Sequence, residues 1–223
     1  MNYTIVIPAR NEEEDIADVI KGCLAISPDI YIVDGHSTDR TREIAASLGA
    51  KILFDRGRGK GDAIRFAIEN INTDILVFID ADGSHDPNDI PKLVAPIIEG
   101  RADIVVGSRF MGGSDELHGD WNKFFRMVGS GLITQSLNWR FHVGLSESQN
   151  GFRAVRRDVA LKLNLKEDIT TIEQEMTIKA LKGGYKIFEV PAHEYARRHG
   201  ESKISLKKVA FRYVWSWLKY LIF

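Results

Sequence analysis

The first half of the chain alternates short β-branched segments with amphipathic stretches, and this alternation constrains the fold more than any other feature. Runs rich in isoleucine and valine lie at residues 4–7, 30–33, 50–54, 75–79 and 104–106. Helix-like stretches separate them, at residues 16–24, 41–48, 62–71 and 89–98. Nearly continuous apolar strands that alternate with helices are typical of a mostly parallel sheet covered on both faces. We therefore predict an α/β fold, and we expect ligands beyond the carboxyl ends of its strands.

The second half of the chain is less regular. Helices are expected at residues 121–139 and 171–181, and strands at residues 151–155 and 185–190. A basic, irregular loop follows at residues 193–203. We predict one α/β domain over residues 1–204, followed by an amphipathic helix over residues 205–223.

The composition excludes several classes of protein. The 223 residues carry a net charge of −1, whereas a nucleic-acid-binding domain normally shows a basic excess. The single cysteine, Cys23, rules out an internal disulfide and lies in an apolar stretch, where it should be buried. No basic, apolar leader opens the sequence, and no uncharged apolar run approaches the roughly 20 residues that cross a bilayer. We expect a cytoplasmic protein without a spanning helix.

A pair of aspartates follows the predicted strand at residues 75–79. Asp80 and Asp82 enclose Ala81, and Gly83 comes next. Carboxylates at the end of a buried strand repel each other and lose solvation, so they require a positive partner. Mg²⁺ or Mn²⁺, bound jointly to carboxylates and substrate phosphates, is such a partner. The alternative is a solvated turn or a helix cap, because Asp-Gly is common in turns.

Polar residues also follow the first two predicted strands. Pro8 ends the first strand and Asn11 can cap the next helix, whereas Arg10 and Glu12 have no such structural explanation. Asp34 stands at the end of the second strand, where it can accept hydrogen bonds from a base or a ribose.

A glycine-rich basic turn, Arg-Gly-Arg-Gly-Lys-Gly, occupies residues 56–61. It lacks the spacing of a P-loop. The turn is therefore either a flexible basic loop or a lid over a pyrophosphate, with Lys60 at its centre.

These motifs, in this order, resemble those of family 2 glycosyltransferases with the GT-A fold. The resemblance rests on Pro-Ala-Arg-Asn-Glu at 8–12, Val-Asp-Gly-His-Ser-Thr-Asp at 33–39, Asp-Ala-Asp-Gly-Ser-His-Asp-Pro at 80–87 and Gly-Ser-Arg-Phe at 107–110. Two later segments, residues 149–153 and 197–203, are similar to the branch of dolichyl-phosphate mannosyltransferases and polyprenyl-phosphate glycosyltransferases. Many family members carry adjacent aspartates where this chain has Asp34-Gly35, which leaves the choice between GDP and UDP open.

The resemblance implies that a hexose moves, with inversion, from GDP-mannose or UDP-glucose to dolichyl or polyprenyl phosphate. The residues that it places at the nucleotide-sugar are Pro8, Ala9, Arg10, Asn11, Glu12, Asp34, Lys60, Asp80, Ala81 and Asp82. Asp80 and Asp82 would also bind Mg²⁺ or Mn²⁺. The residues that it places at the acceptor phosphate are Arg109, Arg153, Arg197, Ser202 and Lys203. It assigns catalysis to Asp82, Arg109, Arg197 and Lys203.

The type of acceptor decides whether a general base is required. A sugar hydroxyl must lose its proton as it attacks, whereas a phosphate monoester is already mostly ionised near neutral pH, with a second pKa of about 6. The basic cluster at 197–203 offers charge-assisted donors to such a phosphate, although it can also be a solvated loop. Glu173 and Glu175 either grip sugar hydroxyls or lie exposed on a helix. A transferase with a soluble acceptor and a non-catalytic nucleotide-sugar-binding protein are the alternatives.

The C-terminal stretch bears on location. At helical spacing, Lys208, Arg212, Ser216 and Lys219 fall on one narrow stripe, and the rest of the circumference is aromatic or aliphatic. Tryptophan and tyrosine favour the membrane interface, where lysine and arginine can extend to the headgroups. We expect this helix to lie in the plane of the cytoplasmic membrane surface, or alternatively to pack on the domain or in a dimer interface.

Overall fold

The computed structural model describes residues 1–115, 121–197 and 206–222. Its centre is a seven-stranded sheet with the order β3-β2-β1-β4-β6-β5-β7. The strands are β1 (Tyr3–Ala9), β2 (Ile30–Asp34), β3 (Lys51–Phe54), β4 (Ile75–Phe78), β5 (Ile104–Ser108), β6 (Arg153–Arg156) and β7 (Ile187–Pro191). β6 runs antiparallel to both β4 and β5, and the other neighbouring strands are parallel. The predicted α/β fold with a mostly parallel sheet is confirmed.

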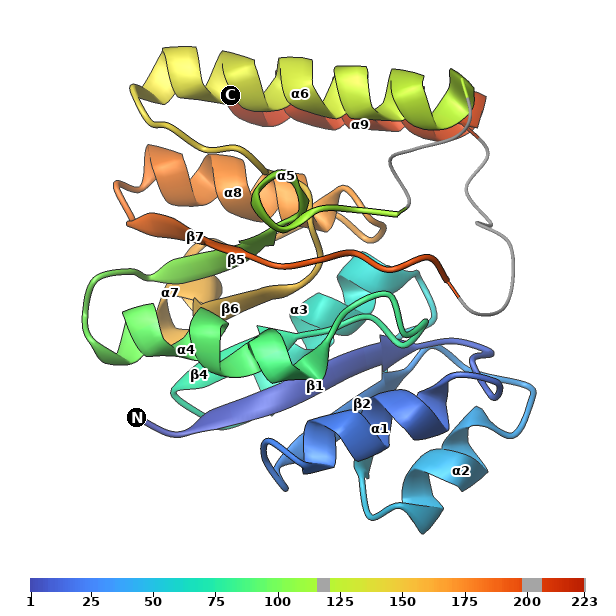
Figure 1. The fold of residues 1–223 in the computed structure, drawn as a ribbon. Helices are drawn as coiled ribbons and strands as arrows, with labels where there is room; N and C mark the ends of the chain where they lie inside the picture. Colours follow the sequence, from blue (N-terminus) through green and yellow to red (C-terminus); the bar gives the residue numbers. More distant parts are fainter. Residues whose placement is uncertain (116–120, 198–205, 223) are drawn as a thin grey trace.

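Helices cover both faces of the sheet (Figure 1). The longer helices of the first half are α1 (Ile16–Leu24), α2 (Thr41–Ser47), α3 (Lys60–Asn70) and α4 (Ile90–Ile98), and a short 3-10 turn, η1 (Pro87–Asp89), precedes α4. The second half contributes α5 (Arg109–Gly112), α6 (Trp121–Phe141), α7 (Arg157–Lys162), α8 (Ile172–Lys182) and α9 (Leu206–Ile222).

Side chains alternate along β1 between two separate hydrophobic clusters. Ile5 and Ile7 join the cluster that contains residues of α1 and α4, whereas Val6 joins the cluster that contains residues of α3, α7 and α8. Successive side chains of a strand point to opposite faces, so an apolar run such as that of β1 is compatible only with a sheet buried on both sides. Cys23 is buried in the first cluster, as expected.

The helices α6 and α9 form an additional layer above α8 (Figure 1). Leu137 of α6, Ile178 of α8 and Tyr220 of α9 meet in a third hydrophobic cluster. The C-terminal helix therefore packs on the α/β domain, which is one of the alternatives that the sequence left open. Within the described residues, no helix is long and apolar enough to cross a membrane.

The order of the strands determines where a ligand can bind. β1 lies between β2, which follows it in the chain, and β4, which comes later. Where the strand order changes direction in this way, the loops at the carboxyl ends diverge and leave a crevice. The loops after β1, β2, β3 and β4 all open toward this crevice.

Candidate active site

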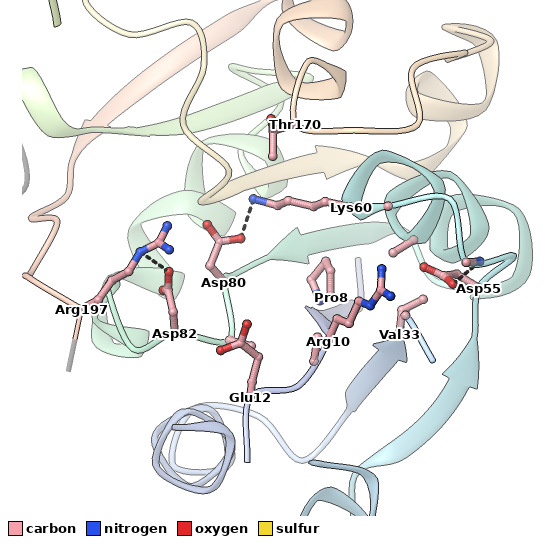
Figure 2. A pocket seen from close by; sticks show the side chains of 16 residues that line it. Pro8, Arg10, Glu12, Val33, Asp55, Lys60, Asp80, Asp82, Thr170 and Arg197 are labelled. Carbon is pink, nitrogen blue, oxygen red and sulfur yellow. Dashed lines mark hydrogen bonds and ion pairs between the residues drawn. The ribbon is translucent and has the colours of Figure 1, made fainter. Parts of the chain in front are cut away.

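A pocket lies at the carboxyl edge of the sheet, where the crevice was expected (Figure 2). The residues that line it are Pro8, Ala9, Arg10, Glu12, Val33, Gly35, Asp55, Gly57, Gly59, Lys60, Ala63, Asp80, Ala81, Asp82, Thr170 and Arg197. Most of the residues that the sequence placed at a nucleotide-sugar therefore surround one cavity. Asp55, at the end of the short strand β3, and Thr170, just before α8, were not predicted from the sequence.

Asn11 and Asp34 support the pocket wall from behind. The Oδ1 atom of Asn11 accepts a hydrogen bond from the amide of Thr38 at 2.8 Å, which joins the loops after β1 and β2. Asp34 is fully buried, and its Oδ2 atom accepts a hydrogen bond from the amide of Ser37 at 3.0 Å. Gly35, the next residue, lines the pocket instead. Asp34 does not line the pocket, and its Oδ1 atom has no hydrogen-bond partner among the described residues, so its contact with a base or ribose stays a prediction.

Lys60 lies between two carboxylates at the base of the pocket. Its Nζ atom is 2.5 Å from Oδ1 of Asp80 and 3.0 Å from Oε1 of Glu173. Burial alone would lower the pKa of Lys60, but the charges of Asp80 and Glu173 outweigh it and hold the pKa above its ordinary value. Burial likewise would raise the pKa of Asp80, and the positive charge of Lys60 more than reverses this effect. A Cβ atom at Gly151 would lie 2.5 Å from Nζ of Lys60, so this ion-pair cluster fits against bare backbone.

Asp82 faces a cation from the second half of the chain. The Nε atom of Arg197 is 2.9 Å from Oδ2 of Asp82 (Figure 2). Oδ1 of Asp82 accepts hydrogen bonds from the amide of Ser84 at 3.1 Å and from its hydroxyl at 2.6 Å. Arg197 therefore lines the same pocket as the two aspartates. Ser202 and Lys203 lie outside the described residues.

Asp80 and Asp82 fit a divalent cation that shares its coordination with a substrate. No group of three or more histidine, cysteine or acidic side chains that could enclose a metal occurs among the residues whose positions the structure gives. Mg²⁺ does not require such a group, because it commonly binds to one or two carboxylates plus substrate phosphates. Both aspartates line the same pocket, and each is held opposite a cationic side chain. A bound metal ion would supply these two carboxylates with the positive charge that Lys60 and Arg197 provide in the structure.

Arg109 is engaged in a different ion-pair network, and its catalytic and acceptor contacts stay predictions. Its guanidinium is 2.8 Å from the carboxylate of Glu147 and 3.2 Å from that of Glu194. Burial would lower the pKa of Arg109, but these two carboxylates raise it above its ordinary value. Because its guanidinium lies between these two carboxylates, Arg109 joins α5 to the segments around residues 147 and 194. Glu194 also accepts a hydrogen bond from the hydroxyl of Ser114 at 2.5 Å.

The structure gives Arg153 a structural role in place of the predicted contact with the acceptor phosphate. It is 1% exposed. Its Nε atom donates to the carbonyl of Asn150 at 2.8 Å, and NH1 donates to the carbonyl of Glu173 at 3.0 Å. Burial lowers the pKa of Arg153. The guanidinium therefore links β6 to the first turn of α8 rather than reaching a phosphate in solution.

The two glutamates of α8 differ in function. Glu173 pairs with Lys60 and is nearly inaccessible. Glu175 is fully buried and accepts hydrogen bonds from the amides of Lys166 at 2.9 Å and Glu167 at 2.8 Å. Neither glutamate is exposed on the helix, which was one of the two alternatives from the sequence. For Glu175, the other alternative, a contact with sugar hydroxyls, does not agree with its burial either.

His85 was not predicted as a site residue. Its ring stacks on that of Phe152, with centroids 4.9 Å apart, and its Nε2 atom is 3.9 Å from Oδ2 of Asp80. Burial lowers the pKa of His85 despite the nearby carboxylate of Asp80, which favours the neutral ring. The available signal was its position three residues after Asp82, but sequence alone did not indicate that the ring would turn back toward Asp80.

An α/β sheet with paired carboxylates and opposing cations at its carboxyl edge defines a site for a phosphate-bearing ligand. The sequence profile described as Glycosyl transferase family 2 matches residues 4–163. The chain therefore belongs to glycosyl transferase family 2.

Individual relatives agree with this assignment. The chain is 34% identical over 198 residues to the glycosyltransferase AglJ of Haloferax volcanii, a match that covers 88% of this chain and 64% of that protein. It is 30% identical over 226 residues to the dolichol-phosphate mannosyltransferase of Pyrococcus furiosus, covering 96% of this chain and 62% of that protein. The chain thus spans less than two thirds of the length of either relative.

A solved structure shares the fold over nearly the whole chain. Glucosyl-3-phosphoglycerate synthase of Mycobacterium tuberculosis, in complex with Mn²⁺, uridine diphosphate and glucosyl-3-phosphoglycerate, superposes with a TM-score of 0.77. The match covers 99% of this chain and 80% of that chain at 21% identity. The predicted GT-A fold is therefore confirmed.

Proposed function

We propose that this protein transfers a hexosyl residue, with inversion, from a nucleoside-diphosphate sugar to the phosphate of a dolichyl or polyprenyl lipid at the cytoplasmic face of a membrane. The observation that carries this proposal is the arrangement in the pocket, where Asp80 and Asp82 lie opposite Lys60 and Arg197. Such a set of alternating charges suits a ligand that brings both phosphates and a divalent cation.

On the donor side, the loops after β1, β2 and β3 offer Ala9, Arg10, Gly35 and Asp55 to the nucleoside. Asp80 and Asp82 would hold Mg²⁺ or Mn²⁺, which when bound neutralises charge on the departing nucleoside diphosphate. Lys60 is within reach of the same diphosphate. Release of Lys60 from Asp80 would leave its ammonium free to donate to a phosphate oxygen.

On the acceptor side, the pocket provides positive charge rather than a general base. Arg197 reaches the pocket next to Asp82. A phosphate monoester is mostly ionised near neutral pH, with a second pKa of about 6, and attacks without a base. We assign Arg197, together with Ser202 and Lys203 in the segment that follows it, to the acceptor phosphate. These side chains would orient the attacking oxygen and reduce its repulsion from the donor diphosphate.

A membrane location is supported by the outer face of α6 and α9. Trp139 of α6 is 79% exposed and Trp215 of α9 is 61% exposed. The further exposed apolar side chains of these two helices are Val128, Leu132, Phe211, Val214, Leu218 and Ile222. We call these eight residues the outer apolar face. An exposed apolar surface made of large side chains on adjacent helices is unusual on a monomeric soluble protein and suits a lipid surface.

The orientation of α9 differs from the one that the sequence suggested. Ser216 is 1% exposed, and Lys219 contacts Glu167, so these members of the predicted polar stripe turn toward the protein. The side chain of Lys208 lies outside the described residues. Arg212, the remaining described member of the stripe, is exposed, so the stripe is divided between the protein and the solvent. The apolar residues on the opposite side of α9 would meet the lipid instead.

The proposal is tested with a matrix of donors and acceptors. GDP-mannose, UDP-glucose and UDP-N-acetylglucosamine are each incubated with Mg²⁺ or Mn²⁺ and with either a short polyprenyl phosphate or 3-phosphoglycerate. We expect a glycosylated polyprenyl phosphate from one donor and no product from the soluble acid. Product on 3-phosphoglycerate alone would favour a soluble acceptor, and binding of nucleotide without any product would favour a non-catalytic protein.

A further inference from the structure

The short segment before α8 contacts both the donor pocket and the C-terminal helix. This segment, residues 166–170, is called here the strap. Its amides at Lys166 and Glu167 are held by the buried carboxylate of Glu175. Thr170, at its end, lines the donor pocket. Its position is therefore fixed by α8 at one end and forms part of the pocket wall at the other.

On the pocket side, the strap presses on the glycine-rich turn that carries Lys60. A Cβ atom at Gly59 would lie 2.8 Å from the carbonyl oxygen of Asp168, and one at Gly61 would lie 2.5 Å from that of Glu167. Real Cβ atoms do not approach backbone so closely, so only glycine permits this contact. The amide of Asp62 also donates to the carbonyl of Asp168 at 3.2 Å. A displacement of the strap would thus shift the turn and change the position of Lys60, which pairs with Asp80.

On the opposite side, α9 holds the strap at both ends. The hydroxyl of Tyr213 donates to the carbonyl of Thr170 at 2.8 Å. The hydroxyl of Tyr220 donates to Oε1 of Glu167 at 2.9 Å, and Nζ of Lys219 is 3.2 Å from the same atom. The helix that carries much of the outer apolar face is therefore hydrogen-bonded directly to Thr170, which lines the donor pocket.

The geometry points to α9 as a positioning element of the donor site, with Tyr213 as the residue that fixes Thr170 in the pocket wall. This inference rests on the proposed function, because it takes the pocket to bind a nucleoside diphosphate. It differs from a view of α9 as a membrane anchor alone, since loss of its contacts would weaken donor binding even with soluble substrates. Tyr213 acts through Thr170 and is not itself catalytic.

The test compares two conservative substitutions on the same helix. Tyr213→Phe keeps the ring and removes the hydroxyl that donates to Thr170. Trp217→Phe is the matched control, because the Nε1 atom of Trp217 donates at 2.9 Å to Ser136 of α6, away from the strap. Each variant loses one hydrogen bond of α9, so the thermal stability of the full-length protein should fall by a similar, small amount in both.

Nucleotide affinity should separate the two variants. Calorimetry with UDP and with GDP, in the presence of Mg²⁺, should show about 3- to 10-fold weaker binding for Tyr213→Phe, as expected for one lost hydrogen bond, and no more than about a twofold change for Trp217→Phe. With substrates, the donor KM should rise in Tyr213→Phe while kcat at saturating donor and the acceptor KM stay unchanged. Equal nucleotide affinity in both variants and in the wild type would overturn the inference, and so would an equal loss in both. A wild-type protein that binds neither nucleotide would instead refute the proposed function.

Discussion

Replacing Lys60 with methionine tests the charge balance of the pocket most directly. Methionine keeps most of the apolar stem of lysine and removes the ammonium that lies between Asp80 and Glu173. The side chain of Glu173 is 2% exposed and that of Asp80 is 27% exposed, so the variant would leave one carboxylate buried and one half-buried without their cation. Removing one partner of a buried ion pair costs about 3–5 kcal/mol. Since Asp80 opens to the pocket, we expect a loss near the lower end, about 3 kcal/mol.

Thermal unfolding in EDTA measures this loss. For a protein of this size, each kcal/mol shifts Tm by roughly 2–4 °C, so Lys60→Met should melt about 6–12 °C below the wild type. Addition of Mn²⁺ should raise the Tm of the variant more than that of the wild type, because a metal ion at Asp80 restores the missing positive charge.

Lys51→Met is the matched control. Lys51 pairs with Asp29 at 2.8 Å, but these side chains are 58% and 39% exposed. Exposed pairs contribute about 0–1 kcal/mol, so this variant should melt within a few degrees of the wild type and show no extra response to Mn²⁺. If Lys60→Met melted like the control in EDTA, the buried pair would be worth no more than an exposed one. If Mn²⁺ shifted the variant and wild type equally, Asp80 would not be a metal ligand.

Three further predictions concern the pocket and the outer apolar face. Asp82→Ala should lose turnover by orders of magnitude in a product assay while circular dichroism shows an intact fold, since Asp82 contributes a carboxylate to the pocket but not to the core; full activity of this variant in excess EDTA would refute metal dependence. The Tm advantage of the wild type over Lys60→Met should be constant from about pH 5 to 9. It should shrink below about pH 4, because the lowered pKa of Asp80 contributes stability above the ordinary aspartate pKa of about 3.9, and this stability is lost as pH falls through the pKa of the folded state. It should also shrink above about pH 10.4, because the raised pKa of Lys60 contributes stability below that ordinary lysine value, and this stability is lost as pH rises through the pKa of the folded state. Combined Trp139→Ser and Trp215→Ser should reduce liposome binding in a flotation assay by at least about tenfold, given roughly 1.5–3 kcal/mol for burying a large apolar side chain, and unchanged flotation would assign the outer apolar face to contacts between protein chains.

The pattern of apolar residues was sufficient to predict the sheet but not all of its topology. The strands β1, β2 and β4 are buried on both faces, and their runs rich in Ile and Val carry that information directly. β6 is as buried as its neighbours, yet it runs antiparallel between β4 and β5. Strand direction depends on where the chain re-enters the sheet, which here follows the long helix α6. The length and composition of one strand do not encode that path.

The site could be predicted where its residues follow strands of the central sheet. The ends of β1 and β4 lie next to each other because these strands are paired, so motifs that are distant in sequence meet in one pocket. The resemblance to family 2 glycosyltransferases placed Arg109 and Arg153 at the acceptor phosphate. Their partners in the structure are the carboxylates of Glu147 and Glu194 for Arg109 and the carbonyls of Asn150 and Glu173 for Arg153. No local sequence pattern indicates these contacts. A basic residue in a family motif can thus maintain the scaffold that holds the site without reaching the ligand.

The orientation of α9 illustrates the same difficulty in a helix. A stripe of lysine, arginine and serine on an otherwise aromatic helix suggests that the stripe faces water and the aromatic residues face lipid. In the structure, Lys219 instead pairs with the carboxylate of Glu167 on the strap. The hydroxyl of Tyr220 donates to the same carboxylate, and the hydroxyl of Tyr213 donates to the carbonyl of Thr170. These three polar side chains of α9 are therefore directed toward the strap, where hydrogen bonds and an ion pair compensate their burial, while Arg212 is exposed. The exposed apolar residues of α9 include Phe211 and Trp215, which border a pocket beside the strap. The contacts that fix the strap and the surface that suits a membrane therefore belong to one helix.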